Sequence, residues 1–285
     1  MDTTEFRKII YANYKKAGRV FPWRQDAKDA GRQDAAWGVL VSEFMLQQTQ
    51  THRVIPYWER WMGLWPRPAD LAGASLETVL REWSGLGYNR RARYLWECAK
   101  AITEEHSGTV PRVPEELLPL PGIGAYTAGA ISCFAYNYPA VFIETNIRAT
   151  VIHFYFQDPL DDTAGKVPSG KVPDAEIFPI LETVLDRKNP RKWYWALMDY
   201  GAALKKITVN PNRRSAHYTR QSPFEGSFRQ IRGRLIRALA SEGPASAKDL
   251  AARTGIETDN LYGALEALQK DSMVAEEGGV YRIGS

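Results

Sequence analysis

Apolar residues recur with the period of an α-helix along almost the whole chain, and this pattern constrains the fold more than any other feature. Strand-like alternation is nearly absent before the C-terminal tail. Helices are predicted at 3–16, 37–50, 51–63, 75–83, 90–106, 114–118, 125–136, 146–156, 174–187 and 191–204. The 285 residues are therefore expected to form an all-α protein, either as one large domain or as a main domain with a small satellite.

The pattern changes after residue 206. Residues 207–226 break the helical pattern with NPN at 210–212 and SPFEG at 222–226, and they are predicted to be a basic linker. Helices are then expected over about 228–241, from a capping-box-like start at 246–249, and over 258–271, before two short strands around a glycine turn. This order predicts a domain over 1–206, a linker over 207–226 and a winged-helix-like α+β domain over 227–285. Such a domain often docks its third helix on DNA. Since Lys270 is the one basic residue there, a packing role is the alternative.

Composition excludes several classes of protein. No run of 18 apolar residues exists to span a bilayer, and the first residues do not resemble a secretory signal, so we expect an intracellular protein of the cytoplasm or nucleoid, with no membrane partner. The two cysteines, Cys98 and Cys133, are too few for a disulfide framework, a four-thiolate zinc site or an iron–sulfur cluster within one chain. Both are expected to be small core residues.

Positive charge is concentrated in one stretch. Residues 205–237 contain nine Lys and Arg against one acid, a local net charge of +8, whereas the whole chain carries only +4. Clustered cations release counterions from phosphates, and the nine tryptophans and 14 tyrosines offer stacking surfaces. The stretch therefore predicts a polyanionic partner, with a merely solvated basic face as the alternative.

Two carboxylates occupy unusual positions. Glu43 falls within the apolar stripe of its predicted helix, where burial would raise its pKa and suit it to general acid catalysis; a salt bridge is the alternative. Glu144 ends an apolar run just before a helix whose N-cap is expected at Thr145 or Asn146. The helix end should keep Glu144 ionised, although it could also be a simple helix-end anion. Two carboxyls with diverging pKa values are the pattern for cleavage at an acetal-like carbon.

A glycine turn joins the predicted helices at 114–118 and 125–136. Gly122 and Gly124 would let the backbone approach a partner closely, and N–H groups at the start of the second helix suit a phosphate held without base specificity. An ordinary turn is the alternative reading.

Five segments together resemble the adenine DNA glycosylase (MutY-like) branch of the helix-hairpin-helix (HhH-GPD) base-excision repair superfamily. They read FPWR at 21–24, VSEFMLQQTQ at 41–50, WSGLGYNRRAR at 83–93, LPGIGAYTAGA at 120–130 and ETNIR at 144–148. The resemblance spans about residues 5–204. It implies a two-lobed helix-hairpin-helix fold with the site in the cleft between the lobes.

The resemblance also implies roles for individual residues. Glu43 would protonate the departing adenine at N7, and Glu144 would stabilise the oxocarbenium-like sugar, with Asn146 and Tyr126 beside them. The pocket for the extruded base would be lined by Trp23, Arg24 and Leu46. Gln48, Thr49 and Tyr88, called the wedge residues below, would fill or wedge the duplex near the orphaned partner base. Gly122 and Gly124 would hold phosphate and could hold a structural monovalent cation. Further DNA contacts are expected from Arg90, Arg91, Lys205, Arg213 and Arg214. Chemistry on a base requires that the base be flipped out of the stack. Residues that wedge the duplex, a pocket for the extruded base and residues that bind the phosphate backbone are therefore expected together.

The chain departs from the family pattern at three points. Glu144-Thr145 stands where the family has Asp-Gly, and the extra methylene moves the charge by roughly 1.5 Å, which could weaken or redirect activity. No cysteine follows Leu204, where the family places four cluster ligands, so we expect no iron–sulfur cluster and phosphate contacts from the basic linker and tail instead. The tail also replaces the Nudix-like domain that reads 8-oxoguanine, which leaves recognition of that lesion open.

Three hypotheses follow from the sequence. The leading one is a monofunctional DNA glycosylase, a monomer without cofactor or metal, that removes adenine mispaired with guanine or 8-oxoguanine in double-stranded DNA. A second is a glycosylase for another base, such as thymine or uracil opposite guanine. The third is a non-catalytic DNA-binding protein, which the pairing of Glu43 with a carboxylate at 144 disfavours. Bifunctional relatives carry a lysine where this chain has Tyr126, so no strand cleavage is expected.

Overall fold

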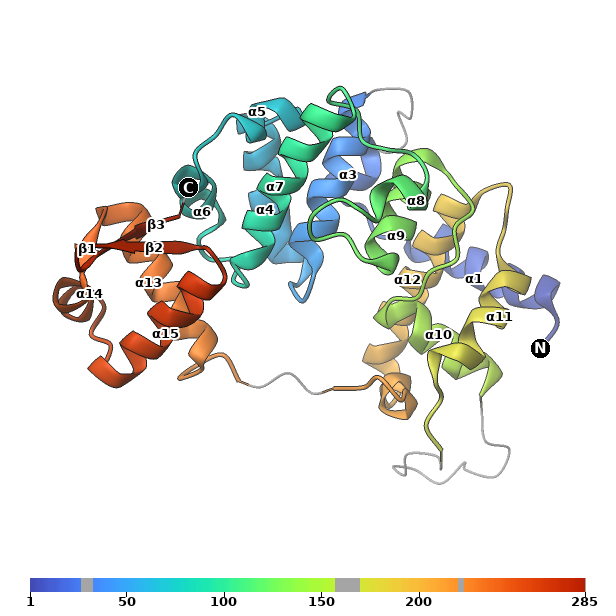
Figure 1. Cartoon of the computed structure of the whole chain (residues 1–285). Helices are drawn as coiled ribbons and strands as arrows, with labels where there is room; N and C mark the ends of the chain where they lie inside the picture. Colours follow the sequence, from blue (N-terminus) through green and yellow to red (C-terminus); the bar gives the residue numbers. More distant parts are fainter. Residues whose placement is uncertain (27–32, 157–169, 220–222, 285) are drawn as a thin grey trace. The chain divides into compact units, whose positions relative to one another are not determined.

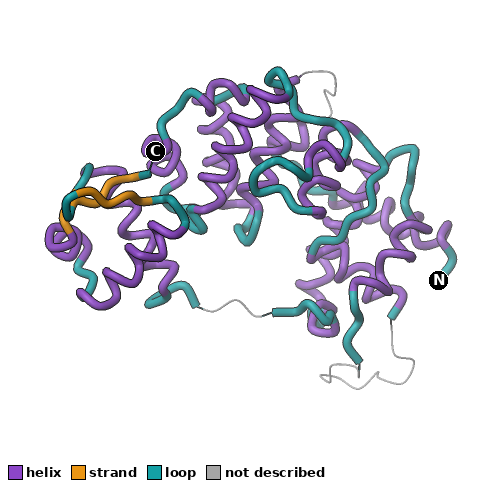
Figure 2. Tube along the Cα trace, viewed as in Figure 1, coloured by secondary structure: helices purple, strands orange, loops and turns teal. Residues whose placement is uncertain are grey.

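The computed structural model describes residues 1–26, 33–156, 170–219 and 223–284. Contacts divide the chain into two units, each assembled from separate stretches (Figure 1). The first unit comprises Met1–Ala30, Pro111–Pro119 and Ile123–Arg220, and the second comprises Gly31–Val110, Leu120–Gly122 and Gln221–Ser285. Helices dominate both units, and among the described residues strands occur only near the C-terminus (Figure 2). The predicted all-α fold with a small α+β tail is confirmed.

The first unit is built around one long helix. It contains α1 (Thr3–Ala17), α2 (Pro22–Asp26), α8 (Pro114–Leu117), α9 (Ala125–Tyr136), α10 (Thr145–Tyr155), α11 (Asp174–Val184), α12 (Pro190–Ile207) and the 3₁₀ helix η2 (Pro211–Arg214). Helix α12 packs against α10 and α1, and its Trp193 meets Phe6 of α1 edge to face at 5.7 Å. Both rings are fully buried, so α12 forms the centre of this core.

The second unit begins with five helices, α3 (Gln33–Leu46), α4 (Thr51–Leu64), α5 (Pro68–Ala72), α6 (Leu76–Trp83) and α7 (Arg90–Glu105). Helix α3 is apolar on every side rather than on one stripe, and its residues from Ala35 to Met45 are all buried. A helix that is hydrophobic all round belongs inside a protein. A tryptophan cluster completes this core, since the Trp61 ring contacts those of Trp65 and Trp83 at 4.7 and 5.3 Å.

The tail of the chain belongs to the second unit as well. It contains α13 (Phe228–Glu242), β1 (Ala245–Ser246), α14 (Ala247–Thr254), α15 (Thr258–Lys270), β2 (Val274–Glu277) and β3 (Val280–Ile283). The strands form an antiparallel sheet in the order β1-β3-β2. Gly278 and Gly279 both have positive φ, as a two-residue hairpin turn requires. The predicted three helices and hairpin are therefore present, and α13 packs against α6.

Every predicted helix is found, with ends shifted by a few residues. The unpredicted elements α2, α5, β1 and η2 are only five, five, two and four residues long, too short to show a period. Within the stretch predicted as a linker, residues 220–222 lie outside the described residues, whereas Asn212 and Ser215 are buried in the first unit and Ser215 pairs with Val172. The division at 206 and 226 stays a prediction. No helix among the described residues is long and apolar enough to cross a membrane.

Candidate active site

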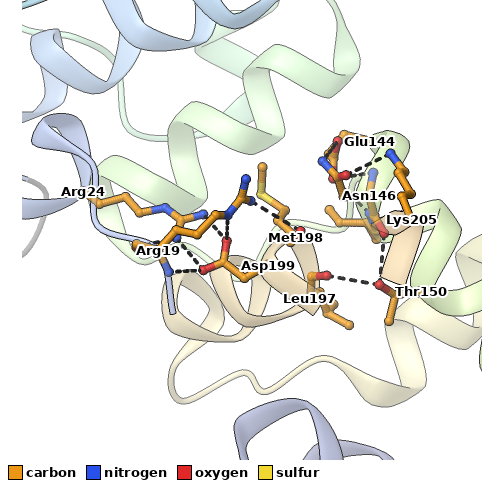
Figure 3. Close-up of polar contacts among 10 residues, drawn as sticks. Arg19, Arg24, Glu144, Asn146, Thr150, Leu197, Met198, Asp199 and Lys205 are labelled. Atoms are coloured by element: carbon orange, nitrogen blue, oxygen red, sulfur yellow. Dashed lines mark hydrogen bonds and ion pairs between the residues drawn. The ribbon is translucent and has the colours of Figure 1, made fainter. Parts of the chain in front are cut away.

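Glu144 caps the helix that follows it (Figure 3). Its Oε1 accepts the backbone N–H groups of Asn146 at 2.7 Å and Ile147 at 2.9 Å, and its Oε2 accepts the Asn146 side-chain amide at 3.1 Å. The expectation that Thr145 or Asn146 would be the N-cap is wrong. The glutamate is long enough to fold back over the N–H groups that α10 leaves open, so it takes the capping role itself.

A lysine completes this cluster. Lys205 Nζ on α12 donates to Asn146 Oδ1 at 2.9 Å, so the amide of Asn146 links the ammonium to the carboxylate. Burial raises the pKa of Glu144, and the two backbone N–H groups together with the charges of Lys205 and Arg19 pull it back only in part. Burial lowers the pKa of Lys205, against the opposing charge of Glu144. The start of α10 therefore favours the ionised form of Glu144, as expected, whereas burial opposes it and is the larger effect on its pKa.

The start of α10 is held against α12 and η2. The Thr150 hydroxyl donates to Asn146 O at 3.0 Å and to Leu197 O at 3.1 Å, and Asn212 Nδ2 donates to Thr145 O at 2.9 Å. A Cβ on Gly201 would overlap the carbonyl oxygen of Asn146 and lie 2.8 Å from Thr150 Oγ1. Only glycine lets the two helices approach this closely. The position of the Glu144 carboxylate thus depends on packing well outside its own helix.

The predicted pocket residues Trp23 and Arg24 belong to a second buried group of the first unit. Asp199 accepts hydrogen bonds from both terminal nitrogens of Arg24 at 3.0 Å. It also accepts hydrogen bonds from the backbone N–H and the Nε of Arg19, at 2.7 Å each (Figure 3). The Arg24 guanidinium lies 5.0 Å from the centroid of the Phe21 ring, which stacks on Trp23 at 5.1 Å. A bidentate ion pair of this kind fixes orientation. Asp199 was not assigned from sequence, because its partners lie 175 and 180 positions away.

Glu43 is buried on α3, with 5% of its surface exposed, as predicted, although the helix is buried on every side there rather than along one apolar stripe. Its neighbours Leu40, Phe44 and Met45 are almost completely buried. Leu46, the other predicted pocket residue, ends the same helix and is partly exposed. Glu43 belongs to the second unit and Glu144 to the first.

Arg91 is not on the surface where a DNA contact was expected. It is 7% exposed, and its guanidinium donates to the carbonyls of Phe44 at 2.9 Å, Met45 at 2.8 Å and Gln47 at 2.7 Å. It also donates to Gly87 O at 2.9 Å. Burial lowers its pKa to about 10, which leaves it charged at neutral pH. Because α3 leaves its last carbonyls open, a buried cation there satisfies them and joins two loops.

Those two loops carry the predicted wedge residues. Gln48 has φ +56° and Tyr88 has φ +51°, a left-handed conformation that is uncommon for such residues. Arg91 donates to Thr49 Oγ1 at 3.1 Å, next to Gln48, and its guanidinium lies 5.6 Å from the centroid of the Tyr88 ring. Strained residues persist where the surroundings determine them, and they cluster at functional sites. The structure therefore brings Gln48, Thr49 and Tyr88 together around one buried arginine.

The hairpin glycines differ in what they require. Gly122 has φ +76°, and a Cβ there would lie 2.6 Å from Tyr94 Cβ and 2.8 Å from Phe44 Cε1, so no other residue fits. Gly124 is the N-cap of α9, and no described atom would lie within 4 Å of a Cβ there. Close packing therefore does not require glycine at this position. Tyr126, in the first turn of α9, meets Phe142 edge to face at 6.0 Å.

The remaining predicted contacts differ in exposure. Arg213 in η2 is exposed, whereas the guanidinium of Arg214 bonds to Phe156 O. Arg90 is exposed and bonds to Asp271. Cys98 and Cys133 lie buried as free thiols on α7 and α9, as predicted, and burial raises the pKa of Cys98. Among the described residues, no group of three or more His, Cys, Asp or Glu side chains could hold a metal ion.

Comparison with known proteins assigns the chain to a family. The sequence profile of the HhH-GPD superfamily of base excision DNA repair proteins matches residues 41–171. The adenine DNA glycosylase of Mycobacterium tuberculosis is 35% identical over 284 residues, which cover 93% of this chain and 88% of that protein.

Two solved structures share the fold. A thermostable thymine-DNA glycosylase superposes with a TM-score of 0.58 at 23% identity, covering 75% of this chain and 94% of its own. Endonuclease III in a non-covalent complex with DNA superposes with a TM-score of 0.53 at 18% identity, covering 79% and 91%. The chain belongs to the HhH-GPD superfamily of base excision DNA repair proteins. Within that superfamily it is a relative of the adenine DNA glycosylases.

Proposed function

We propose that this chain is a DNA glycosylase that binds double-stranded DNA, as a monomer, and hydrolyses the N-glycosidic bond of adenine mispaired with guanine or 8-oxoguanine. The observation that carries the proposal is the buried carboxyl of Glu43, in a segment matched by the family profile, together with the hydrogen-bonded carboxyl of Glu144. The 35% identity to an adenine DNA glycosylase over 93% of the chain supports adenine as the base.

The two carboxyls suit the two halves of the reaction. Glu43, buried among apolar side chains, would donate a proton to N7 of adenine as the bond from the base to the sugar C1′ breaks. The Glu144 carboxylate would stabilise the positive charge that develops at C1′, and water would then add its oxygen there and lose a proton to solvent, from which Glu43 would be protonated again. Asn146 would orient that carboxylate by donating to its Oε2, and Lys205 would in turn hold the Asn146 amide by donating to its Oδ1.

The extra methylene of Glu144 is accommodated rather than left misplaced. The side chain curls back to reach the N–H groups of Asn146 and Ile147, so its oxygens lie over the start of α10. Aspartate, a good N-cap, would reach the same groups with a shorter side chain. We therefore expect Glu144→Asp to retain base release and Glu144→Gln to lose it.

We further propose that the enzyme works without an iron–sulfur cluster and without strand cleavage. A four-thiolate cluster does not fit, because the chain has two cysteines, and both are buried on separate helices. Tyr126 cannot form the imine that β-elimination requires. Purified protein should contain no stoichiometric iron by elemental analysis; iron at one cluster per chain would contradict this.

The decisive experiment compares Glu43→Gln with Glu82→Gln. Glu82 offers a matched control, since its carboxyl is also mostly covered but pairs with Arg60 at 2.6 Å. A duplex with adenine opposite guanine is incubated with excess enzyme, and abasic sites are revealed by alkali. Glu43→Gln should release no base and keep its affinity for the duplex within a few-fold, whereas Glu82→Gln should match the wild type. Substantial base release by Glu43→Gln would refute the catalytic role of this residue.

A further inference from the structure

A groove of about 1160 Å³ opens within the second unit beside the predicted wedge residues. One wall is α13 of the tail, and the other is formed by the loops that carry Gln48 and Tyr88. Gly122 of the hairpin also borders it. The groove therefore connects the tail, which the proposed function does not yet use, with the residues expected at the duplex.

The side chains along this groove are strongly basic. Besides the buried Arg91, six arginines line it, and no acidic side chain does so among the described residues; they are Arg53, Arg90, Arg229, Arg232, Arg234 and Arg237. Arg53, Arg90, Arg234 and Arg237 are exposed. A concave surface lined by one sign of charge concentrates a ligand of the opposite sign.

The spacing of residues on α13 explains how one helix can line the groove with one face and bury its other side in the tail. Arg229, Arg232, Gly233, Ile236 and Arg237 recur every three or four residues, so they share one face, and all of them line the groove. Leu235 and Leu239 lie on the other side and are buried. Gly233 has no described atom within 4 Å of the position its Cβ would take, so the face is open at that point, whereas Ile236 is buried.

The arginines are anchored on both walls, some by neutral groups and two of them by Asp271. Arg237 Nε donates to Ser84 Oγ at 3.0 Å, and the Arg229 guanidinium bonds to the Tyr88 hydroxyl and lies 5.1 Å from the centroid of its ring. Asp271, which ends α15, bonds to both Arg90 and Arg232. One carboxylate thus holds the tail against α7, while the arginines that line the groove keep a large excess of positive charge.

We propose that this groove binds the phosphate backbone of duplex DNA beside Gln48 and Tyr88, and that α13 is the DNA-binding helix of the tail. This inference rests on the proposed function and identifies the surface that binds the DNA substrate. Guanidinium groups match phosphate geometry and release counterions on binding. The third helix α15 is a poorer candidate, because it exposes Asp259 and Glu266 as well as Lys270. In this respect the tail departs from the usual winged-helix docking.

The test is the salt dependence of DNA binding by the full chain. Affinity for a fully matched duplex and for a mispaired one is measured by fluorescence anisotropy between about 50 and 200 mM salt. The logarithm of the association constant K falls linearly with the logarithm of the salt concentration, and each phosphate contact contributes about 0.9 to the steepness of this slope. The double variant Arg234→Gln/Arg237→Gln should make the slope of log K against log salt less steep by about 2, equally for both duplexes. Thermal melting confirms that this variant is folded.

The matched control is Arg253→Gln/Arg282→Gln. It removes the same charge from the same tail, but at positions on α14 and β3 that do not line the groove. Its slope should equal that of the wild type. Equal losses in the two double variants would mean that only net charge matters, and an unchanged slope in the groove variant would mean that the arginines serve another partner, such as an acidic protein; either result overturns the proposal.

Two further readouts separate this inference from its rivals. Lys270→Gln should leave the slope unchanged, whereas a loss there without a loss in the groove variant would assign docking to α15 and refute the proposal. Base release with saturating enzyme should be unaffected by the control Arg253→Gln/Arg282→Gln. If the wild type releases no base, the proposed function fails, yet the binding slopes, measured on unreacted duplex, still decide the role of the groove.

Discussion

Gly201→Ala tests whether packing between α10 and α12 positions the Glu144 carboxylate. The new Cβ would overlap the Asn146 carbonyl oxygen and lie 2.7 Å from its carbon and 2.8 Å from Thr150 Oγ1. Unstrained contacts need about 3.5 Å, so the start of α10 must move by roughly 1 Å. Overpacking of this kind costs about 1–3 kcal/mol of folding free energy.

The same displacement should appear in the rate of base release. Asn146 Nδ2 and its N–H both bond to Glu144, so moving Asn146 moves the carboxylate. A misplacement of about 1 Å can lower a rate by about 100-fold. We expect a loss of that order in single-turnover base release with enzyme in excess, and a smaller free energy of unfolding in urea.

Gly263→Ala provides the control for this experiment. Gly263 lies inside α15, with no described atom within 4 Å of the position of a Cβ. Alanine there should stabilise the protein by about 0.5–1 kcal/mol and leave the rate unchanged. If Gly201→Ala also keeps the wild-type rate and stability, the close contact between α10 and α12 does not position the carboxylate.

Three further predictions concern Arg91, Tyr126 and Asp271. Arg91→Met should lower the free energy of unfolding by about 3 kcal/mol, because it strands buried carbonyls, and should weaken duplex binding; a loss below about 1 kcal/mol would contradict the role of Arg91. The wild type should give no covalent DNA complex with borohydride, whereas Tyr126→Lys should give one if this position faces the sugar; efficient trapping by the wild type would contradict monofunctional activity. Burial alone would raise the pKa of Asp271, but Arg232 and Arg90 hold it below its usual range. Asp271→Asn should therefore destabilise the protein at neutral pH, and the difference in urea unfolding should fade as the pH falls below about 4, through the depressed pKa; a difference that persists at low pH would contradict the ion pairs.

Helix periodicity predicted the fold well because most of the long helices bury one face, and the residues of that face recur every three or four positions in the sequence. Contacts between distant residues were not visible in the same way. Arg91 follows a glycine-rich loop among other arginines, a pattern typical of a phosphate-binding surface, yet its acceptors lie 44 to 47 positions earlier at the end of α3. Only the folded chain shows which of several neighbouring arginines points inward.

The site shows the same division. Burial of Glu43 was predicted from the apolar residues around it, whereas the capping role of Glu144 was not predicted, since glutamate is not a favoured N-cap residue. Lys205 was expected to contact DNA because it opens the basic stretch, but the helical path of α12 carries it to Asn146. Asn212 was assigned to a linker because it follows a proline, although its side chain holds Thr145. In each case the missing information was the tertiary partner.

The most direct test of the proposed function is the identity of the base that is set free. Duplexes containing A opposite G, A opposite 8-oxoguanine, T opposite G and U opposite G are incubated with the wild-type protein, and the released base is identified by mass spectrometry. Adenine should be released from both of its mispairs, with nothing released from the T or U duplexes or by Glu43→Gln. Release of thymine or uracil, or of no base at all, would contradict the proposal.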